Sequence, residues 1–319
     1  MSEATTRKVI AELKSVYFDW FFINKSIEIT QNNKGLLSKF AKVAEVKYEV
    51  GNGIQQDVLK AQVEVSRFIE RLELLNEKNK ILEFKINKIL NRPLNSHLGD
   101  PQKVVKTEFK LTLDEISNLT LQNAPIIKSS IDFVDSKEES LNLAGMQYLP
   151  DFLVGATYFN RSGGSQDLDD LWQLSLGLRV PLYFWKKERF GVEEASFDLL
   201  EAKNNHTSVS NNIMFKVKDS FITAKTAEKL LDLYSSGIIP QSSLSLESAI
   251  SGYQVGDVDF LTLLNNLVTL FNFELEYYNQ LTVFQKALVE IEELSGLEII
   301  GIQSIPETNK KYKGENLDE

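Results

Sequence analysis

Few side chains in this sequence have the type and spacing that catalysis or metal binding requires. The chain has no cysteine, which excludes a disulfide scaffold, a zinc–thiolate site and a cysteine nucleophile. Of its two histidines, His97 falls in an irregular segment and His206 is expected on a helix surface, each without a second ligand at metal-site spacing. Asp167, Asp169 and Asp170 lack the remaining ligands of a calcium loop, so we expect a solvated acidic loop there. These residues predict no enzyme, no cofactor and no metal site.

The composition limits the classes of partner and of architecture. The 319 residues include 45 acidic and 35 basic side chains, and the net charge of −10 argues against nucleic acid as a partner. Only 16 glycines and 7 prolines are present, which favours long uninterrupted elements, although the length alone would suit about two ordinary domains. No apolar run reaches the roughly 18 residues of a membrane-spanning helix, and the N-terminus does not resemble a signal peptide.

Helical periodicity covers most of the chain. Apolar residues recur every three or four positions over 5–48, which predicts one helix of about 66 Å. Further helices are expected over 57–92, 112–146 (begun by a capping box of Thr112 and Glu115), 186–252 (kinked at 237–240) and 260–295. The clearest heptads give a and d positions at Val58, Val65, Leu72, Asn79 and Ile86, and at Ala61, Phe68, Leu75, Leu82 and Ile89. A Gly-Asn-Gly break at 51–53 makes the first two helices an antiparallel hairpin.

Between residues 150 and 185, apolar residues recur at every second position instead of every third or fourth. One face of the predicted strand carries Trp172, Leu174, Leu176, Leu178, Val180 and Leu182, and the other carries Gln173, Ser175 and Arg179. The length suits the roughly 9–11 residues of a tilted transmembrane strand, and aromatic residues stand at both ends. A half-buried soluble strand would alternate in the same way, so both interpretations stay open at this point.

The chain repeats itself. Tyr48–Gly51 (YEVG) recurs as Tyr253–Gly256 (YQVG), an offset of 205 residues. The same offset carries the first heptad series onto Leu263, Leu270, Tyr277, Phe284 and Ile291, all of them apolar. We therefore expect a mainly α fold of long antiparallel helical hairpins in two internal repeats, with one β-hairpin between them. Because a lone two-stranded hairpin is marginal in water, its strands should pair with other chains.

The combination resembles the TolC-like outer-membrane efflux proteins. The matching pieces are YEVGNGIQQDVLKAQVEV (48–65), YLPDFLVGATY (148–158), GLRVPLYFW (177–185) and IIPQSSLSLESAISGYQVGDVDFLTLLNN (238–266). The last three resemble the branch that exports heavy-metal cations more than the multidrug branch. The resemblance covers about residues 5–298.

The resemblance implies a passive export duct for metal cations or small toxic molecules. In this family a homotrimer forms a 12-stranded barrel in outer-membrane lipid, continued by a helical tunnel into the periplasm. A periplasmic adaptor protein and an inner-membrane pump, expected to be of the RND type, complete the exporter. On this basis Trp172 and its neighbours of the apolar face would meet lipid, while Gln173, Ser175 and Arg179 would face the lumen.

The resemblance also assigns a role to the two hairpin turns. Tip residues that would dock the adaptor are Tyr48, Gly51, Asp57, Leu59, Tyr253, Gly256, Asp257, Asp259 and Thr262. Constriction carboxylates of multidrug members match Thr262 and Asn265 here, so a gate would have to use Asp257 or Asp259. The plainer interpretation is that the glycines permit tight turns and the tyrosines pack the seam, and both interpretations can hold.

The expected organisation is an incomplete first repeat over 1–111, a second repeat over 112–304 and a polar tail over 305–319. The second repeat contains the strand hairpin (about 150–185) and a long helical hairpin (186–298). Compared with the family, a signal peptide, a first helix and a first strand hairpin are expected to be missing at the N-terminus. Three copies would then supply six strands instead of 12.

The alternatives are a soluble coiled-coil scaffold or interaction protein, or a non-functional truncated efflux gene product. Heptads and acidic charge suit a scaffold equally well. The segment 150–185 discriminates, because a scaffold has no need of an apolar strand face flanked by aromatic residues.

Overall fold

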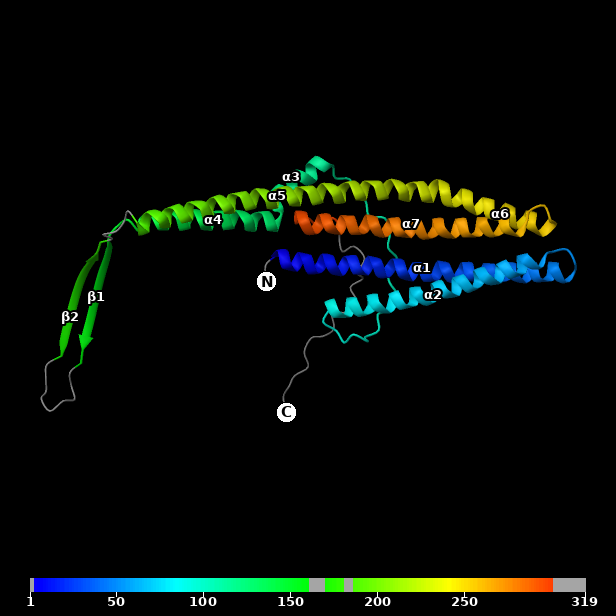
Figure 1. Cartoon of the computed structure of the whole chain (residues 1–319), viewed down its shortest axis with the longest axis horizontal. Coiled ribbons are helices and arrows are strands. Elements are labelled where there is room, and N and C mark those ends of the chain that lie inside the picture. The colour runs from blue at the N-terminus through cyan, green and yellow to red at the C-terminus, as the bar shows by residue number, and fades with distance from the viewer. Residues whose placement is uncertain (1–2, 161–169, 181–185, 301–319) are drawn as a thin grey trace. The chain divides into compact units, whose positions relative to one another are not determined.

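The computed structural model describes residues 3–160, 170–180 and 186–300, which form two compact units. One unit comprises Met1–Pro125 and Met214–Glu319, and the other comprises Ile126–Ile213. Figure 1 shows that both are built mainly from long helices, with a single pair of strands in the described part of the chain. The predicted fold class, mainly α with a β-hairpin, is confirmed.

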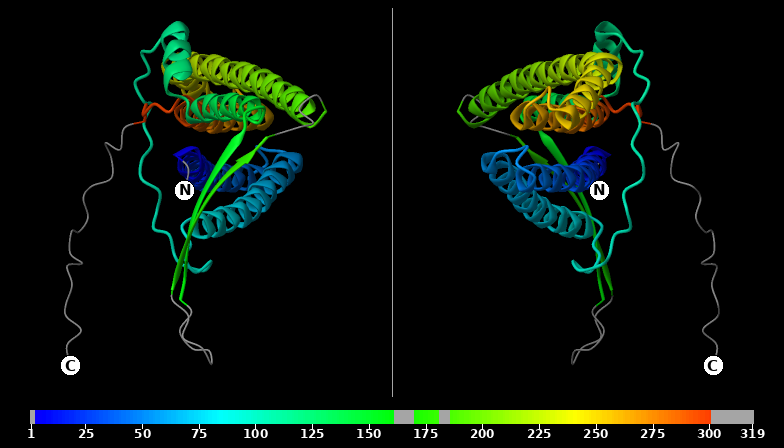
Figure 2. Two further views of the ribbon diagram at one scale, coloured as in Figure 1. Left: turned by 90° about the vertical axis from the view of Figure 1, so that its left-hand side faces the viewer. Right: turned by 90° about the vertical axis from the view of Figure 1, so that its right-hand side faces the viewer.

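Two antiparallel helical hairpins make up most of the larger unit. The first joins α1 (Glu3–Glu49) to α2 (Gln55–Ile89), and the second joins α6 (Ile239–Val255) to α7 (Phe260–Ser295). Helix α1 packs against both α2 and α7, so the two hairpins lie side by side, as both views of Figure 2 show. The helices predicted over 5–48, 57–92 and 260–295 are confirmed to within three residues at each end.

The heptad pattern places the core correctly. In the first seam Ala61, Phe68, Leu72, Leu75 and Ile86 are buried and the other positions are partly buried. In the second seam the buried positions are Leu263, Leu270, Phe284, Ile291, Ala287 and Leu294. One cluster joins the two hairpins, with the rings of Phe68 and Phe271 4.9 Å apart. Burial of these apolar faces is what holds helices of this length together.

The single helix predicted over 112–146 is wrong, because two helices occupy that segment. Helix α3 (Leu113–Asn123) begins at the predicted capping box, in which Thr112 and Glu115 bond reciprocally. It ends at Ala124, whose ψ of 117° is extended, and α4 (Pro125–Met146) follows. Proline disfavours helical geometry at the residue before it and has no N–H for the preceding helix, which explains the break at Pro125.

The predicted kink in the long helix is a π-helical turn. Helix α5 (Lys187–Leu233) passes into π-helix Tyr234–Ile238 and then into α6. Pro240 lies in the first turn of α6, where its missing N–H would leave an α-helical carbonyl without a partner. A switch to i→i+5 bonding accommodates this, as the bond from the Ile239 N–H to the Tyr234 carbonyl shows.

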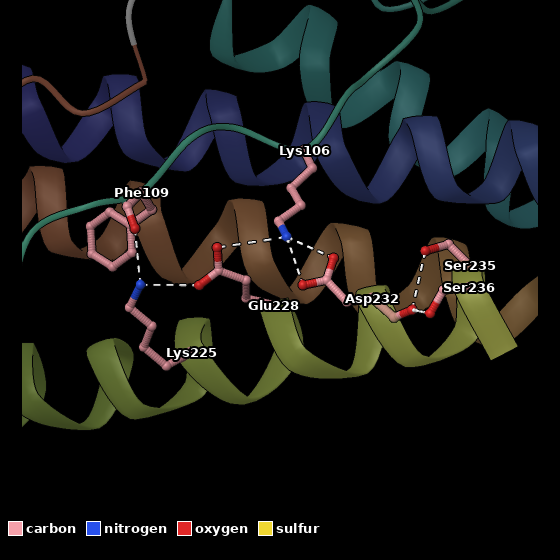
Figure 3. Close-up of polar contacts among 7 residues, drawn as sticks. All are labelled: Lys106, Phe109, Lys225, Glu228, Asp232, Ser235 and Ser236. Atoms are coloured by element: carbon pink, nitrogen blue, oxygen red, sulfur yellow. Dashed lines mark hydrogen bonds and ion pairs between the residues drawn. The ribbon is translucent and has the colours of Figure 1, made fainter. Parts of the chain in front are cut away.

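The extended segment before α3, which contains Lys106 and Phe109 and is called the strap below, contacts α5 next to the π-helical turn (Figure 3). Lys106 Nζ lies 2.9 Å from Asp232 Oδ1 and 3.7 Å from Glu228 Oε1. Lys225 Nζ donates to the Phe109 carbonyl at 2.9 Å and to Glu228 Oε2 at 3.0 Å. The strap therefore has a structural role at the end of α5.

The smaller unit contains the strands. Helix α4 contacts α5 through Lys137 and Asp198, whose Nζ and Oδ2 atoms are 2.7 Å apart. Strands β1 (Asp151–Phe159) and β2 (Leu171–Arg179) pair antiparallel, with Val154 opposite Leu176. Within the described residues, no helix is both long and apolar enough to cross a membrane.

Candidate functional site

The two hairpin turns share one backbone hydrogen bond, from the residue after the glycine, at positions 205 residues apart. In the first, the Asn52 N–H donates to the Lys47 carbonyl at 2.8 Å while Gly51 has a φ of +76°. In the second, the Asp257 N–H donates to the Gly252 carbonyl at 2.9 Å while Gly256 has a φ of +92°. Both are left-handed glycine caps of the Schellman type. The repeat seen in the sequence is therefore also a repeat of local structure.

The two turns contact each other through Lys47, which sequence reasoning missed. Its ammonium lies 4.2 Å from the centroid of the Tyr253 ring and donates to the Tyr253 carbonyl oxygen. Tyr253 is buried, and its ring lies 5.7 Å from that of Phe260. A cation held over an aromatic face and a carbonyl is a favourable arrangement at a partly desolvated site. The paired turns, residues 47–60 and 252–262, are called the tip below.

Carboxylates at the tip have different environments. The Asp259 carboxylate accepts from the Thr262 backbone N–H at 2.6 Å as the N-cap of α7, and this bond lowers the pKa of Asp259. Partial burial raises the pKa of Asp57, and the negative charge of Asp259 raises it further, while Lys60 opposes both. Asp257 is exposed. The tip therefore carries negative charge close to Lys60.

The structure divides the predicted tip residues into two groups. Tyr253 packs in the seam, as the plainer interpretation had it, while Tyr48 and Leu59 are exposed, as are Val50, Ile54 and Val255. Thr262 is exposed, and its backbone N–H is bonded to Asp259. Val50, Ile54 and Val255 were not singled out from the sequence, because the heptad pattern does not show whether an apolar residue outside the seam faces solvent or a partner protein.

We expect Gly256→Ala to lower the free energy of unfolding by about 1–2 kcal/mol, because an L side chain at this φ of +92° is strained. Gly35→Ala is the matched control, since Gly35 lies inside α1 and an added Cβ would meet nothing within 4 Å. This control should stabilise the chain by about 0.5–1 kcal/mol. Denaturant unfolding followed by circular dichroism measures both changes. A loss of stability in both variants would contradict the assignment of strain to the left-handed cap.

A second candidate surface lies on the strand hairpin. The register pairs Phe152 with Leu178, Val154 with Leu176, Ala156 with Leu174, and Tyr158 with Trp172. These pairs alternate with Asp151 and Arg179, Leu153 and Gly177, Gly155 and Ser175, and Thr157 and Gln173. One face is therefore apolar across both strands, and Leu176 on that face is 84% exposed. Val180 is exposed just beyond β2, and Leu182 lies outside the described residues.

The remaining candidates for chemistry are dispersed. His97 is exposed, and His206 is partly exposed on α5, with Nδ1 2.8 Å from Ser130 Oγ. Asp170 accepts a hydrogen bond from the Tyr158 hydroxyl, and Asp167 and Asp169 lie outside the described residues. In the described part of the chain, no three His, Cys, Asp or Glu side chains group as a metal site would require.

A comparison with protein families identifies the chain. The model of the family "Outer membrane efflux protein" matches residues 116–297, more than half of the sequence. The chain belongs to the outer membrane efflux protein family. No match was found among curated proteins.

Solved structures of bacterial outer-membrane proteins share the fold of this efflux-family chain. VceC of Vibrio cholerae is 13% identical, with a TM-score of 0.81 over 91% of this chain and 70% of VceC. The CmeC outer-membrane channel of Campylobacter jejuni is 16% identical, with a TM-score of 0.78 over 92% and 63%. The MtrE outer-membrane channel of Neisseria gonorrhoeae is 14% identical, with a TM-score of 0.76 over 92% and 67%.

This efflux-family chain spans about two thirds of the length of these three proteins. Family membership confirms the resemblance to TolC-like proteins and supports an outer-membrane efflux channel, which agrees with the prediction that the protein is not an enzyme. The favoured branch, the tip and strand roles, and the boundaries of the repeats stay predictions.

Proposed function

We propose that this chain forms part of a passive duct that exports metal cations or small toxic molecules across the periplasm and outer membrane. The apolar face shared by β1 and β2 is the observation that carries the proposal. Trp172, Leu174, Leu176 and Val154 are each more than 70% exposed on it. So large an exposed apolar face is unusual for a water-soluble surface and marks contact with a membrane or a protein.

The dimensions and the ends of the hairpin support lipid as the partner. Each strand has nine residues, the length of a tilted membrane strand. Tyr158 and Trp172 pair at one end, with ring centroids 4.8 Å apart, as expected for an interfacial aromatic girdle. On the opposite face, Gln173, Ser175 and Arg179 would line the water-filled lumen.

Assembly as a homotrimer would provide hydrogen-bond partners for the backbone groups at the free edges of β1 and β2. In the described chain β1 and β2 pair only with each other, so each leaves one edge of backbone groups without strand partners. In lipid such edges are tolerated only in a closed sheet, which here requires strands from other copies. The outer membrane is thus the proposed location, with helical hairpins extending into the periplasm.

The tip is the proposed site of the periplasmic adaptor and of closure. Exposed Tyr48 and Leu59 offer apolar contact area, while Asp57, Asp257 and Asp259 supply negative charge. Gly51 and Gly256 set the turns that present these side chains. Asp259 caps α7, so of the two aspartates considered for a gate Asp257 has the freer side chain and is our preferred candidate. An inner-membrane pump of the RND type would supply energy and substrate choice.

Quenching of Trp172 fluorescence tests the membrane assignment. With Trp20→Phe and Trp185→Phe, Trp172 is the sole tryptophan, since the chain has three. After reconstitution into phospholipid vesicles, we expect bromine-labelled acyl chains to quench Trp172 and water-soluble iodide to quench it little, because the ring faces lipid. Strong quenching by iodide with none by brominated lipid would instead indicate the soluble scaffold and overturn the proposal.

A further inference from the structure

A groove beside the π-helical turn contains none of the strand residues or tip residues to which the proposed duct assigns a role. It has a volume of about 470 Å³ and lies where α1, α6 and α7 meet. Ser235 of the π-helix and Ile239 of α6 line it, so the widened turn forms part of its wall. Its volume is within the usual range for small-molecule sites, roughly 300–1,000 Å³, and π-helical turns often occur at functional positions.

The lining combines apolar surface with one carboxylate that forms no ion pair. Leu246 and Leu270 supply apolar side chains, and Glu274 supplies the only charge among the described residues that line the groove. Partial burial raises the pKa of Glu274, against a hydrogen bond from Asn33 that lowers it. Among the ion pairs of the described residues none includes Glu274, so its negative charge has no cationic partner.

Two tyrosine rings stand beside this carboxylate. Tyr277 and Tyr278 line the groove, and their ring centroids are 5.2 Å apart in an edge-on arrangement. The Lys25 ammonium lies 6.0 Å from the centroid of the Tyr278 ring and is paired with Glu28 at 2.5 Å. The lysine charge is therefore already matched by a carboxylate outside the groove. Aromatic faces next to a carboxylate attract cations that are only weakly hydrated.

We propose that this groove binds a small organic cation with an apolar body, such as a quaternary ammonium that carries an aromatic group. Glu274 would balance the charge, the tyrosine rings would contact the ammonium, and Leu246 and Leu270 would contact the apolar part. A bare divalent metal ion fits less well, because it needs about six oxygen ligands and the groove presents one carboxylate. The proposal does not depend on the export duct, since binding can be measured on the isolated chain.

Calorimetric titration of the purified full chain with benzyltrimethylammonium, in a non-ionic detergent, tests the site. We expect saturable binding, weakened about tenfold or more by Glu274→Gln, which keeps the shape and removes the charge. Glu276→Gln is the matched control, because Glu276 lies two residues away on α7 and bonds Asn279 and Gln280 instead of lining the groove. This control should leave the affinity within about twofold.

Two further measurements distinguish the contribution of the probe's charge from that of the shape of the groove. Neopentylbenzene, the neutral isostere of the probe, should bind about tenfold more weakly or worse. Asn32→Trp, at an exposed position on α1 that lines the groove, should block binding of the cation without altering the carboxylate. Undetectable binding to the unaltered chain, equal affinity for the neutral isostere, or equal losses in E274Q and E276Q would each overturn the proposal.

Discussion

Leu176→Arg is expected to destabilise the chain in phospholipid vesicles by about 2–4 kcal/mol, because it places a charge near the bilayer midplane. Leu176 lies close to the middle of β2 and is 84% exposed. In water, an arginine at so exposed a position would change stability by no more than about 0.5 kcal/mol. The size of the loss in stability therefore shows whether lipid or water surrounds β2.

Ser175→Arg is the matched control for Leu176→Arg. Ser175 is the preceding residue of the same strand, and its side chain lies on the opposite, polar face beside Gly155. If that face is wetted, the arginine should cost less than about 1 kcal/mol. Denaturant titrations of both variants in vesicles measure the difference. Equal tolerance of arginine at the two positions would count against a membrane strand.

Most of the fold could be predicted from periodicity because its elements are long. A helix of 47 residues such as α1 repeats its apolar spacing many times. The 205-residue offset shows the same pattern a second time in the chain. The break at Pro125 was missed because the apolar period continues on both sides of it. The kink at Pro240 was located, but the sequence does not tell a bend from a π-helical turn, since that depends on how freed carbonyls are bonded.

At the tip, the turns could be predicted from the sequence, but the contacts between side chains could not. Gly51 and Gly256 indicate turns from their type alone, and the structure confirms positive φ at both. The contact of Lys47 with Tyr253 joins residues 206 positions apart, and no local pattern contains that information. Asp259 was considered for a gate, whereas its carboxylate is bonded to the Thr262 N–H. Similarly, the uncompensated charge of Glu274 becomes visible only when three helices are packed together.

One seam position is polar in the first repeat and aromatic in the second, and this difference leads to the other large prediction. Asn79 of α2 corresponds to Phe284 of α7 at the 205-residue offset. Phe284 has no exposed surface, whereas Asn79 is partly buried and its Oδ1 accepts from Asn24 Nδ2 at 3.0 Å. The same heptad position is therefore filled by a large apolar group in one hairpin and by a polar pair in the other.

We expect Phe284→Ala to lower the free energy of unfolding by about 3–5 kcal/mol, because it removes a fully buried ring and leaves a cavity. Asn79→Ala should cost only about 0.5–1.5 kcal/mol, since it removes a hydrogen bond at a position that water can reach. Denaturant unfolding of the full chain, followed by far-ultraviolet circular dichroism, gives both values. Equal losses would mean that the two hairpins use this seam position alike, because a polar pair in α2 would then contribute as much as a buried ring in α7.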